Sequence, residues 1–224
     1  MSLRQKIRST PWDKVAFGVD CFELADASPG LLELALATPG HYTVKVDPSA
    51  SKQALHRHGF YYCDTLIEPW CTPQGLARFA HDEIAIDSAP ALDALIGICH
   101  GAFLRGRFHR DFNIDAKRAD SRYDNWLREL HRDGKVYGLL YRGEPAGFVA
   151  RSEDSLVLHA MSERYRGKGL AKYFWSMLCA LMFAEGLPEI RSSISAANLA
   201  ALNLYAALGF RFRNPTDVYH RMVP

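Results

Sequence analysis

The residues best suited to chemistry lie between an apolar segment at 155–161 and the helical pattern that follows it. The connection reads Ser162-Glu-Arg-Tyr-Arg-Gly-Lys-Gly-Leu-Ala171. A strand–turn–helix arrangement leaves the first amides of the helix without intrahelical acceptors, so they can converge on an anion. Glycine lets a phosphate approach the backbone, and Arg and Lys add full charges to the helix dipole. The turn is therefore predicted to hold a phosphate with Arg166, Gly167, Lys168, Gly169, Leu170 and Ala171.

The spacing excludes two common phosphate motifs. A P-loop needs Gly-x-x-x-x-Gly-Lys-Ser/Thr, and a dinucleotide fold needs Gly-x-Gly-x-x-Gly at the start of the helix. Here Gly167-Lys-Gly169 is followed by Leu170, Ala171 and Lys172, without a third glycine or a hydroxyl for magnesium. The alternative interpretation is a basic, glycine-rich turn that only caps a helix.

A second pattern follows in the stretch from Asn198 to Phe210. Asn198 stands where a helix N-cap is expected, and Gly209 stands where the helix would end in the left-handed conformation. Tyr205 lies two helical turns after Asn198, so the two side chains share one face. The alternative for Tyr205 is an ordinary core residue of an amphipathic helix.

Together the two patterns resemble the GNAT superfamily of N-acetyltransferases, whose Arg/Gln-x-x-Gly-x-Gly/Ala turn holds the pyrophosphate of acetyl-CoA. The resemblance implies acetyl-CoA as co-substrate, with Asn198 at its pantetheine arm and Tyr205 as the acid that protonates the departing thiolate. It also implies that the arm pairs with the strand near His159 to Met161. The Met161 amide would then polarise the thioester carbonyl.

The implied reaction is direct attack of a neutral amine on the thioester, without a covalent enzyme intermediate. A phenol with a pKa of about 10 is a suitable acid for a thiolate leaving group of about 8.5 to 9. His159 is a candidate proton acceptor for the amine, and the alternatives are a packed or surface histidine and a water chain. Transfer through a cysteine is disfavoured because no cysteine has an evident histidine partner.

The chain has 224 residues, 48% of them apolar, and can bury a substantial core. Turn formers at 69–75 predict a small α/β N-terminal domain over 1–78 and a second domain over 79–224. The resemblance implies a GNAT-type α/β (α+β) fold for the second domain, a mixed central sheet with splayed middle strands flanked by helices. The segment Gln53–Phe60 echoes the ending of the second pattern, which fits either a degenerate half-GNAT or a common helix-to-strand joint.

Periodicity and turn residues predict the individual elements. In the first part, helices are expected over 29–36 and 51–58 and strands over 42–46 and 60–67, after an apolar segment at 15–20. In the second part, helices are expected over 91–103, 120–131, 169–185 and 198–208. Strands are expected over 83–87, 136–140, 146–150, 155–161, 189–195, 210–213 and 217–222.

The acceptor is indicated by a narrower resemblance, to the acetyltransferases that modify dTDP-linked amino-deoxysugars such as dTDP-fucosamine. It rests on Trp12–Val19, on the stretch from Val44 to Thr65, and on Phe103–Asp111 with Tyr123–Trp126. Cations and aromatic rings that alternate in the loop suit the diphosphate and base of a nucleotide. These are Phe103, Arg105, Arg107, Phe108, His109, Arg110 and Phe112. The alternative is a solvated basic loop with its aromatic rings in the core.

Two other functions stay open beside the amino-sugar acetyltransferase. One is a GNAT enzyme acting on another amine, such as a peptide N-terminus, a polyamine or a small metabolite. The other is a non-catalytic acyl-CoA-binding module, which the presence of Gly169 and Tyr205 disfavours. The expected partner is a small-molecule amine, best a nucleotide-linked amino sugar, and the resemblance also admits a homodimer.

Charge and composition exclude several other classes. The net charge of +2 with dispersed arginines gives no basis for a nucleic-acid partner. The sequence lacks a run of about eighteen apolar residues and a signal-peptide pattern, which predicts a cytoplasmic protein without a membrane span. Five cysteines without Cys-x-x-Cys pairs indicate buried thiols in a reducing compartment. His56-Arg-His58 has no acidic or thiol partner on its own element, so no metal site is predicted.

Overall fold

The computed structural model describes residues 2–224. The first part of the chain comprises a 3-10 helix η1 (Leu3–Lys6), β1 (Ile7–Ser9), α1 (Pro11–Phe17), β2 (Cys21–Leu24), α2 (Pro29–Leu36), β3 (Gly40–Val46), α3 (Gln53–Arg57) and β4 (Tyr61–Cys71). The second part comprises β5 (Ile84–Asp87), α4 (Leu92–Cys99), α5 (Ala116–Arg132), β6 (Val136–Tyr141), β7 (Glu144–Ser152), β8 (Ser155–Met161), a 3-10 helix η2 (Glu163–Tyr165), α6 (Ala171–Ala184), β9 (Ile190–Ser192), β10 (Ile194–Ser195), α7 (Leu199–Ala207) and β11 (Arg211–Val223).

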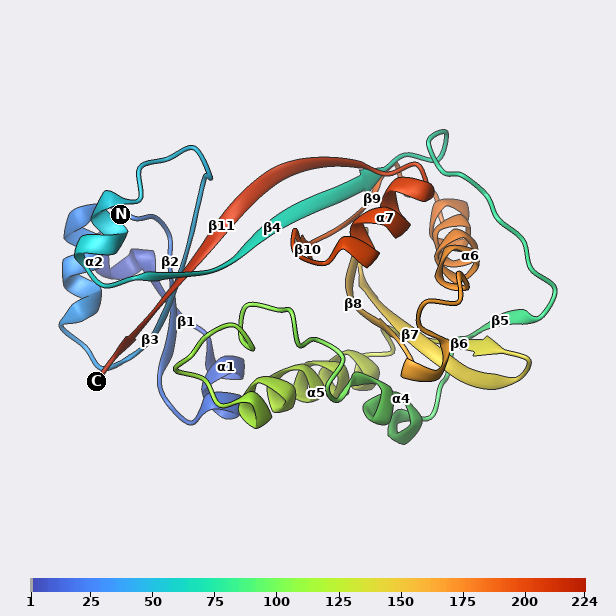
Figure 1. The fold of residues 1–224 in the computed structure, drawn as a ribbon, viewed down its shortest axis with the longest axis horizontal. Helices are drawn as coiled ribbons and strands as arrows, with labels where there is room; N and C mark the ends of the chain where they lie inside the picture. Colours follow the sequence, from blue (N-terminus) through green and yellow to red (C-terminus); the bar gives the residue numbers. More distant parts are fainter. Residues whose placement is uncertain (1) are drawn as a thin grey trace.

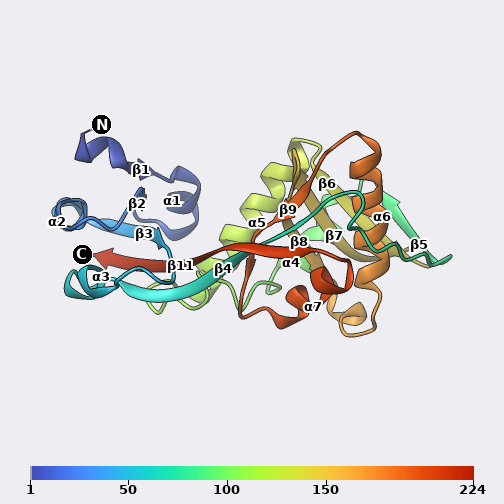
Figure 2. The same cartoon turned by 90° about the horizontal axis from the view of Figure 1, so that it is seen from above.

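One mixed sheet runs through the molecule in the order β1-β2-β3-β11-β4-β9-β8-β7-β6-β5, and β10 pairs with β4 beside this path. The long strands β4 and β11 are antiparallel and lie in the middle, connecting the N-terminal strands to the rest of the sheet (Figure 1). Viewed from above, they run from the end that holds α2 and α3 toward α6 and α7 (Figure 2). The fold is the mixed α/β sheet flanked by helices that the sequence predicts.

Helices cover both faces of the sheet in the second part. Along β7, Phe148 and Ala150 pack in a core with α4 and α5, whereas Val149 packs in a core with α6 and α7. This alternation follows from the period of two in a strand. Among residues 2–224, no helix combines the length and the apolar character needed to cross a lipid bilayer.

Most predicted elements are confirmed, two of them to the residue. Helix α2 over Pro29–Leu36 and strand β8 over Ser155–Met161 lie where the periodicity places them. The hairpin of β6 and β7 turns through Arg142 and Gly143, both at positive φ (54° and 80°), as a two-residue turn requires. All five cysteines are buried and free, as predicted.

Several predicted boundaries are wrong. The two closing strands expected over 210–213 and 217–222 form the single strand β11, because a bulge between Arg213 and Thr216 absorbs the turn-forming residues. Conversely, the single strand expected over 189–195 is broken at residue 193 into β9 and β10. The apolar segment at 15–20 contains the end of α1, which Gly18 closes at a φ of 74°. Helix α5 begins at Ala116, one turn before the predicted start, because Asp115 caps it.

Strand β4 bears on the proposed division of the chain at about residue 78. It belongs to the predicted first domain, yet it pairs with β9, β10 and β11 of the second. Strand β11 in turn pairs with β3. The division into residues 1–78 and 79–224 remains a prediction, and the sheet itself is continuous across it.

Candidate active site

The parallel strands β8 and β9 separate after two residue pairs. Only Ser155 with Arg191 and Leu156 with Ser192 are in register, although β8 continues to Met161. After residue 193 the chain turns to β10, which pairs with β4 instead. The last residues of β8 therefore have β7 on one side and, among residues 2–224, no strand partner on the other. We refer to this edge, residues 157–161, as the open edge of β8.

The register of β8 against β7 determines which backbone groups face the open edge. Ser162 N–H donates to Ala146 O at 2.8 Å, and Met161 lies opposite Gly147. Because antiparallel pairs alternate between hydrogen-bonded and non-hydrogen-bonded, the Gly147–Met161 pair is of the second kind. The N–H and C=O of Met161 therefore point away from β7, and those of His159 follow the same alternation. The residues that sequence analysis expected to pair with an extended ligand thus turn backbone groups toward the open edge that no neighbouring strand among residues 2–224 takes up.

The turn between β8 and α6 carries a run of unpaired amides. The N–H groups of residues 167–172 find no hydrogen-bond acceptor among residues 2–224. Gly167 and Gly169 have φ values of 73° and 72°, which disfavour any other residue, and the space where their Cβ atoms would lie is empty. The N-cap residue of α6, Leu170, has no side chain that accepts these amides. Unpaired amides at the N-terminus of a helix are the geometry that the predicted anion cradle requires.

The charged residues of the cradle have different positions. Arg166 donates from Nε to the carbonyl of Met161 at 2.8 Å, so its side chain joins the cradle to the open edge of β8. Lys168 is exposed, and its ammonium group lies 5.7 Å from the ring of Tyr165. Both leave cationic groups at a turn whose amides already favour an anion.

Tyr205 and His159 meet beside the open edge. The Tyr205 hydroxyl lies 3.1 Å from His159 Nε2, although the residues come from α7 and β8. Tyr205 is fully buried, and burial raises the pKa of its phenol above the usual value. Burial lowers the pKa of His159 to about 4, so its ring is neutral at pH 7. A protonated phenol next to a neutral imidazole is an arrangement that can donate and accept a proton at neutral pH.

Asn198 is the N-cap residue of α7, as predicted. Its side-chain oxygen accepts from Ala201 N–H at 3.2 Å. Its side-chain amide nitrogen makes no hydrogen bond to the other described residues, and the residue is half-buried. One end of the side chain is therefore occupied by the cap and the other is available to a ligand.

Residues 103–210 match the model of the Acetyltransferase (GNAT) family. Over these residues the chain is similar to GNAT acetyltransferases. The matched range contains the open edge of β8, the cradle, Asn198 and Tyr205, and the match supports an acyltransferase. Among curated proteins, the search finds no matching sequence.

Solved structures of GNAT proteins share the fold. A GCN5-related N-acetyltransferase from Sphaerobacter thermophilus is similar over 83% of this chain, with a TM-score of 0.60 and 15% identity, and the match spans 61% of that protein. A GNAT-family acetyltransferase from Colwellia psychrerythraea is similar over 91% of this chain and 81% of its own, with a TM-score of 0.58 and 14% identity. A tandem GNAT protein from the clavulanic acid biosynthesis pathway is similar over 88% of this chain and 68% of its own, with a TM-score of 0.51 and 12% identity.

The loop between α4 and α5 is bonded to β4, the long strand of the first part of the chain. Asp64 on β4 accepts from Arg110 of this loop at 3.2 Å and from Ser195 of β10 at 2.7 Å. Through Asp64, the loop is therefore linked to β4 and to β10, which pairs with β4 after the chain leaves β9. Its aromatic residues divide between two roles, because Phe108 is buried whereas Phe112 is 78% exposed. The aromatic rings of the loop are thus divided between the core and the surface, and binding of a nucleotide by the loop stays a prediction.

The same loop is anchored by a cluster that sequence analysis missed. Asp111 Oδ2 accepts from His41 Nε2 at 2.9 Å and from His220 Nδ1 at 2.7 Å, and Oδ1 accepts from Tyr61 at 2.7 Å and from Asn113 N–H at 2.9 Å. Burial alone would raise the pKa of Asp111, but the hydrogen bonds from His220 and His41 outweigh it and hold the pKa far below the usual value. The carboxylate is thus fully satisfied by loop and sheet.

The side chains of His41, Asp111 and His220 place potential metal-ligand atoms within 4.8 Å of one another. We therefore ask whether their chemistry fits a metal ion. Metal-ligating histidines generally donate their second ring nitrogen to a partner, whereas Nε2 of His220 is buried without one. The contacts of 2.7 and 2.9 Å are hydrogen-bond lengths, and the second carboxylate oxygen is occupied by Tyr61. The chemistry of the set fits a hydrogen-bonded anchor for the loop better than a metal centre.

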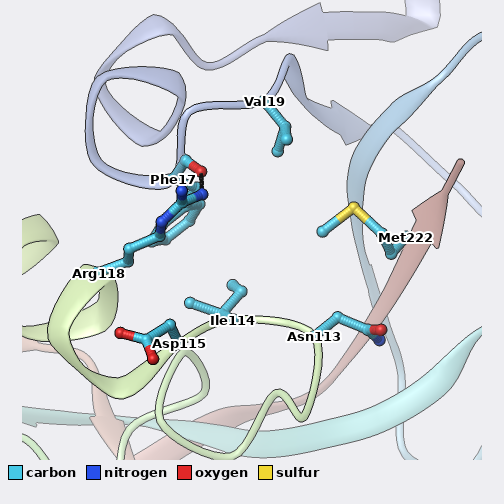
Figure 3. Close-up of a pocket in the computed structure, with 7 residues that line it drawn as sticks. All are labelled: Phe17, Val19, Asn113, Ile114, Asp115, Arg118 and Met222. Carbon is cyan, nitrogen blue, oxygen red and sulfur yellow. Dashed lines mark hydrogen bonds between the residues drawn. The ribbon is translucent and has the colours of Figure 1, made fainter.

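A cavity of about 440 Å³ lies next to the end of the α4–α5 loop, between α1, the start of α5 and the end of β11 (Figure 3). Its lining combines apolar and polar side chains: Phe17, Val19, Asn113, Ile114, Asp115, Arg118 and Met222. None of the residues predicted for catalysis or cofactor binding lines it. Arg118 donates to the carbonyl of Phe17 at its wall.

Proposed function

We propose that this protein transfers the acetyl group of acetyl-CoA directly to a primary amine. The observation that carries the proposal is the open edge of β8 next to a preformed anion cradle. Extended pantetheine would pair with the backbone of His159 and Met161 as an additional strand does, and the pyrophosphate would lie on the amides of residues 167–172. Arg166, Lys168 and the side chain of Asn198 would complete the binding site for the cofactor.

The same positions assign the chemical roles. The Met161 N–H would donate to the thioester oxygen, and this hydrogen bond strengthens as negative charge develops on that oxygen. The amine nitrogen forms the new bond to the carbonyl carbon, the carbon–sulfur bond breaks, and Tyr205 supplies the proton to the thiolate. The neutral His159 is the candidate acceptor of the proton that the amine loses, with a water chain as the alternative.

For the acceptor, we propose the amine of a nucleotide-linked amino-deoxysugar of the dTDP type. The surface beside the α4–α5 loop supports this choice. The ring of Phe112 lies against that of Tyr61 at a tilt of 38°, with ring centroids 4.3 Å apart, and the guanidinium of Arg110 lies 5.5 Å from the ring of Tyr62, which is 45% exposed. Exposed rings next to a guanidinium group offer stacking to a base and charge to a diphosphate.

The deciding experiment measures release of the CoA thiol from acetyl-CoA with a panel of amines. The panel contains dTDP- and UDP-linked 3- and 4-amino-6-deoxyhexoses, the free sugars, peptides, polyamines and antibiotic amines. Turnover with one sugar nucleotide and not with the free sugar is the expected result. Turnover only with another amine would discard the sugar while keeping the mechanism, and tight binding of acetyl-CoA without turnover would favour an acyl-CoA-binding module.

A variant of the surface separates recognition of the nucleotide from chemistry. Phe112→Ala removes an exposed ring, so we expect the KM for the sugar nucleotide to rise roughly tenfold, which corresponds to about 1.4 kcal/mol, while kcat changes little. Leu181→Ala on α6 removes another exposed apolar side chain, 49% exposed, and is the control. Equal KM values for the two variants would place the nucleotide elsewhere.

A further inference from the structure

A third aromatic side chain converges on the pair of Tyr205 and His159. Trp175 lies in α6, only 2% exposed, and its ring meets that of His159 edge-on at a centroid distance of 5.2 Å. Trp175 and Tyr205 belong to the same apolar core. Two helices, α6 and α7, and one strand, β8, thus bring three polar aromatic side chains together beside the open edge.

The indole N–H of Trp175 is an exception in this core. It is buried and makes no hydrogen bond to an acceptor among residues 2–224. Buried donors are nearly always paired, so an unpaired one needs an explanation. A phenylalanine would fill a similar apolar site without leaving a donor unsatisfied, which indicates that packing alone does not account for tryptophan.

The Tyr205 oxygen belongs to the same cluster, because it lies 3.1 Å from Nε2 of His159, whose ring Trp175 meets edge-on. Burial raises the pKa of Tyr205, and Ser192 and the Trp175 side chain act in the opposite direction, as donors directed at the phenol oxygen do. The Ser192 hydroxyl is already committed to the carbonyl of Leu156, at 2.7 Å. This leaves the indole as the donor that can strengthen when charge develops on the phenol oxygen.

We propose that Trp175 is a positioning residue for the acid of the reaction, and this inference rests on the proposed function. As Tyr205 gives its proton to the thiolate, its oxygen becomes negative, and the indole N–H closes on that oxygen. The phenolate is thereby stabilised in a core that otherwise disfavours charge. The proton moves from oxygen to sulfur, and the indole keeps its own proton throughout.

The kinetic test compares Trp175→Phe with a control in the same core. Trp175→Phe keeps an aromatic ring and removes the N–H, so we expect kcat to fall roughly tenfold, because hydrogen bonds to charged groups are among the stronger ones. The KM for acetyl-CoA should stay within twofold. Phe174→Leu, a change at a fully buried neighbour, should lower stability and leave kcat near that of the wild type.

A double mutant distinguishes positioning from packing. In a Tyr205→Phe background, Trp175→Phe should cause no further loss of kcat, since the oxygen that the indole serves is gone. An equal loss in both backgrounds would overturn the proposal. If Trp175→Phe does not fold, replacement of Trp175 by 3-benzothienylalanine, which has sulfur in place of the N–H, provides the same comparison with the ring size kept.

A spectroscopic test does not depend on turnover. The chain has four tryptophans, so the indole N–H signals of the labelled protein are few enough to assign by substitution. Tyr205→Phe removes the hydroxyl group from the surroundings of the Trp175 N–H, so it should shift the signal of Trp175 and leave those of Trp12, Trp70 and Trp126 in place. If the protein acetylates no amine but this shift occurs, the proposed function fails and the contact stands. An unshifted signal would remove Trp175 from the vicinity of the Tyr205 oxygen.

Discussion

The two halves of the sheet repeat one order of elements, and only one of them leaves a strand edge open. In the first half, β2, α2, β3, α3 and β4 follow one another. In the second half, β8, α6, β9, α7 and β11 have the same order, with the short elements η2 and β10 inserted after β8 and β9. The pairs β2–β3 and β8–β9 are both parallel, and each half ends in a long strand antiparallel to the other half. That residues 1–78 are a degenerate half of the same fold stays a prediction beside the alternative of a common helix-to-strand joint.

The correspondence extends to the ends of the short helices α3 and α7. Gly59 donates to His56 O and Phe60 to Leu55 O, just as Gly209 donates to Ala206 O and Phe210 to Tyr205 O. Both glycines have positive φ, at 71° and 83°. By this pattern Leu55 occupies the place in the first half that Tyr205 occupies in the second.

The difference between the halves lies in the pairing and in the amides. Strand β2 pairs with β3 at all of its residues, Cys21–Leu24, and so has no open edge on that side. The connection to α2 is short, α2 begins with Pro29, which has no N–H, and Ser28 N–H is taken by Asp26. The comparison teaches that the common topology does not make a cofactor site. The candidate cofactor site depends on two features that the first half lacks, the break after β9 and the glycine turn before α6.

The largest effect is expected at Tyr205, whose counterpart in the first half is Leu55. Tyr205→Phe keeps the ring in the core and removes the acid, so kcat should fall roughly 10²-fold while the affinity for acetyl-CoA stays nearly unchanged. Turnover measured across pH and calorimetric binding of acetyl-CoA check both parts. A kcat equal to that of the wild type at every pH would show that Tyr205 is not the acid.

The counterpart change at Leu55 completes this comparison. Leu55 is fully buried, so Leu55→Ala should lower the free energy of unfolding by about 2 to 5 kcal/mol. The folded fraction should keep the kcat of the wild type. Denaturant unfolding and turnover per folded molecule measure the two quantities, and a specific loss of kcat would mean that the first half contributes to the reaction.

The next effect concerns the glycine turn that the first half lacks. Gly169→Val should weaken binding of acetyl-CoA at least tenfold, or about 1.4 kcal/mol, because the side chain enters the cradle and strains a left-handed residue. Gly186→Val is the matched control, since Gly186 also has a positive φ, 92°, and open space at its Cβ position but lies at the other end of α6. Equal affinity in the two variants would remove Gly169 from the phosphate site.

Two buried histidines, His159 on β8 and His220 on β11, are expected to make stability depend on pH. Burial lowers the pKa values of both His159 and His220 to about 4, below the 6.5 of an exposed histidine. Between these values the unfolded chain binds protons that the native protein does not, so stability is full above pH 6.5 and is lost as the pH falls toward 4. We expect each histidine to remove roughly 2 kcal/mol of unfolding free energy at pH 4.5.

Variants assign this loss to its two sources. His220→Gln keeps a hydrogen-bond donor toward Asp111 and cannot titrate. His159→Gln keeps a polar side chain that can accept from the Tyr205 hydroxyl, and it cannot titrate either. Each should flatten the dependence of the unfolding free energy on pH by about half, and only His159→Gln should change turnover. A dependence that neither variant alters would assign the acid sensitivity to other groups.

Some elements of the fold can be predicted from the sequence alone, and others cannot. Strand β8 and helix α2 are predicted to the residue because their apolar pattern and their boundary residues agree. The break at residue 193 is not visible, since Ile190-Arg-Ser-Ser-Ile-Ser195 alternates like one continuous strand. The defining feature of the site, an open strand edge, therefore came only through the resemblance.

The tertiary clusters show the second limit. His41, Asp111 and His220 come from β3, a loop and β11. Their spacing along the sequence does not predict that they are in contact. Trp175 lies in an apolar helical pattern in which it is indistinguishable from a core residue. Local patterns specify elements and turns, whereas polar contacts between distant elements depend on how the sheet is ordered.

The smallest effect is expected at the N-cap of α7, where a structural and a binding role coincide in Asn198. Asn198→Ala should cost about 1 kcal/mol of stability through loss of the bond to Ala201 N–H, and should also weaken acetyl-CoA binding severalfold. Asn198→Ser keeps a cap but lacks the amide nitrogen, so it should regain most of the stability and none of the affinity. Unfolding and binding measured on both variants separate the roles. Affinity restored by serine would mean that Asn198 acts only through the helix, and that the pantetheine arm is held by the open edge of β8 without it.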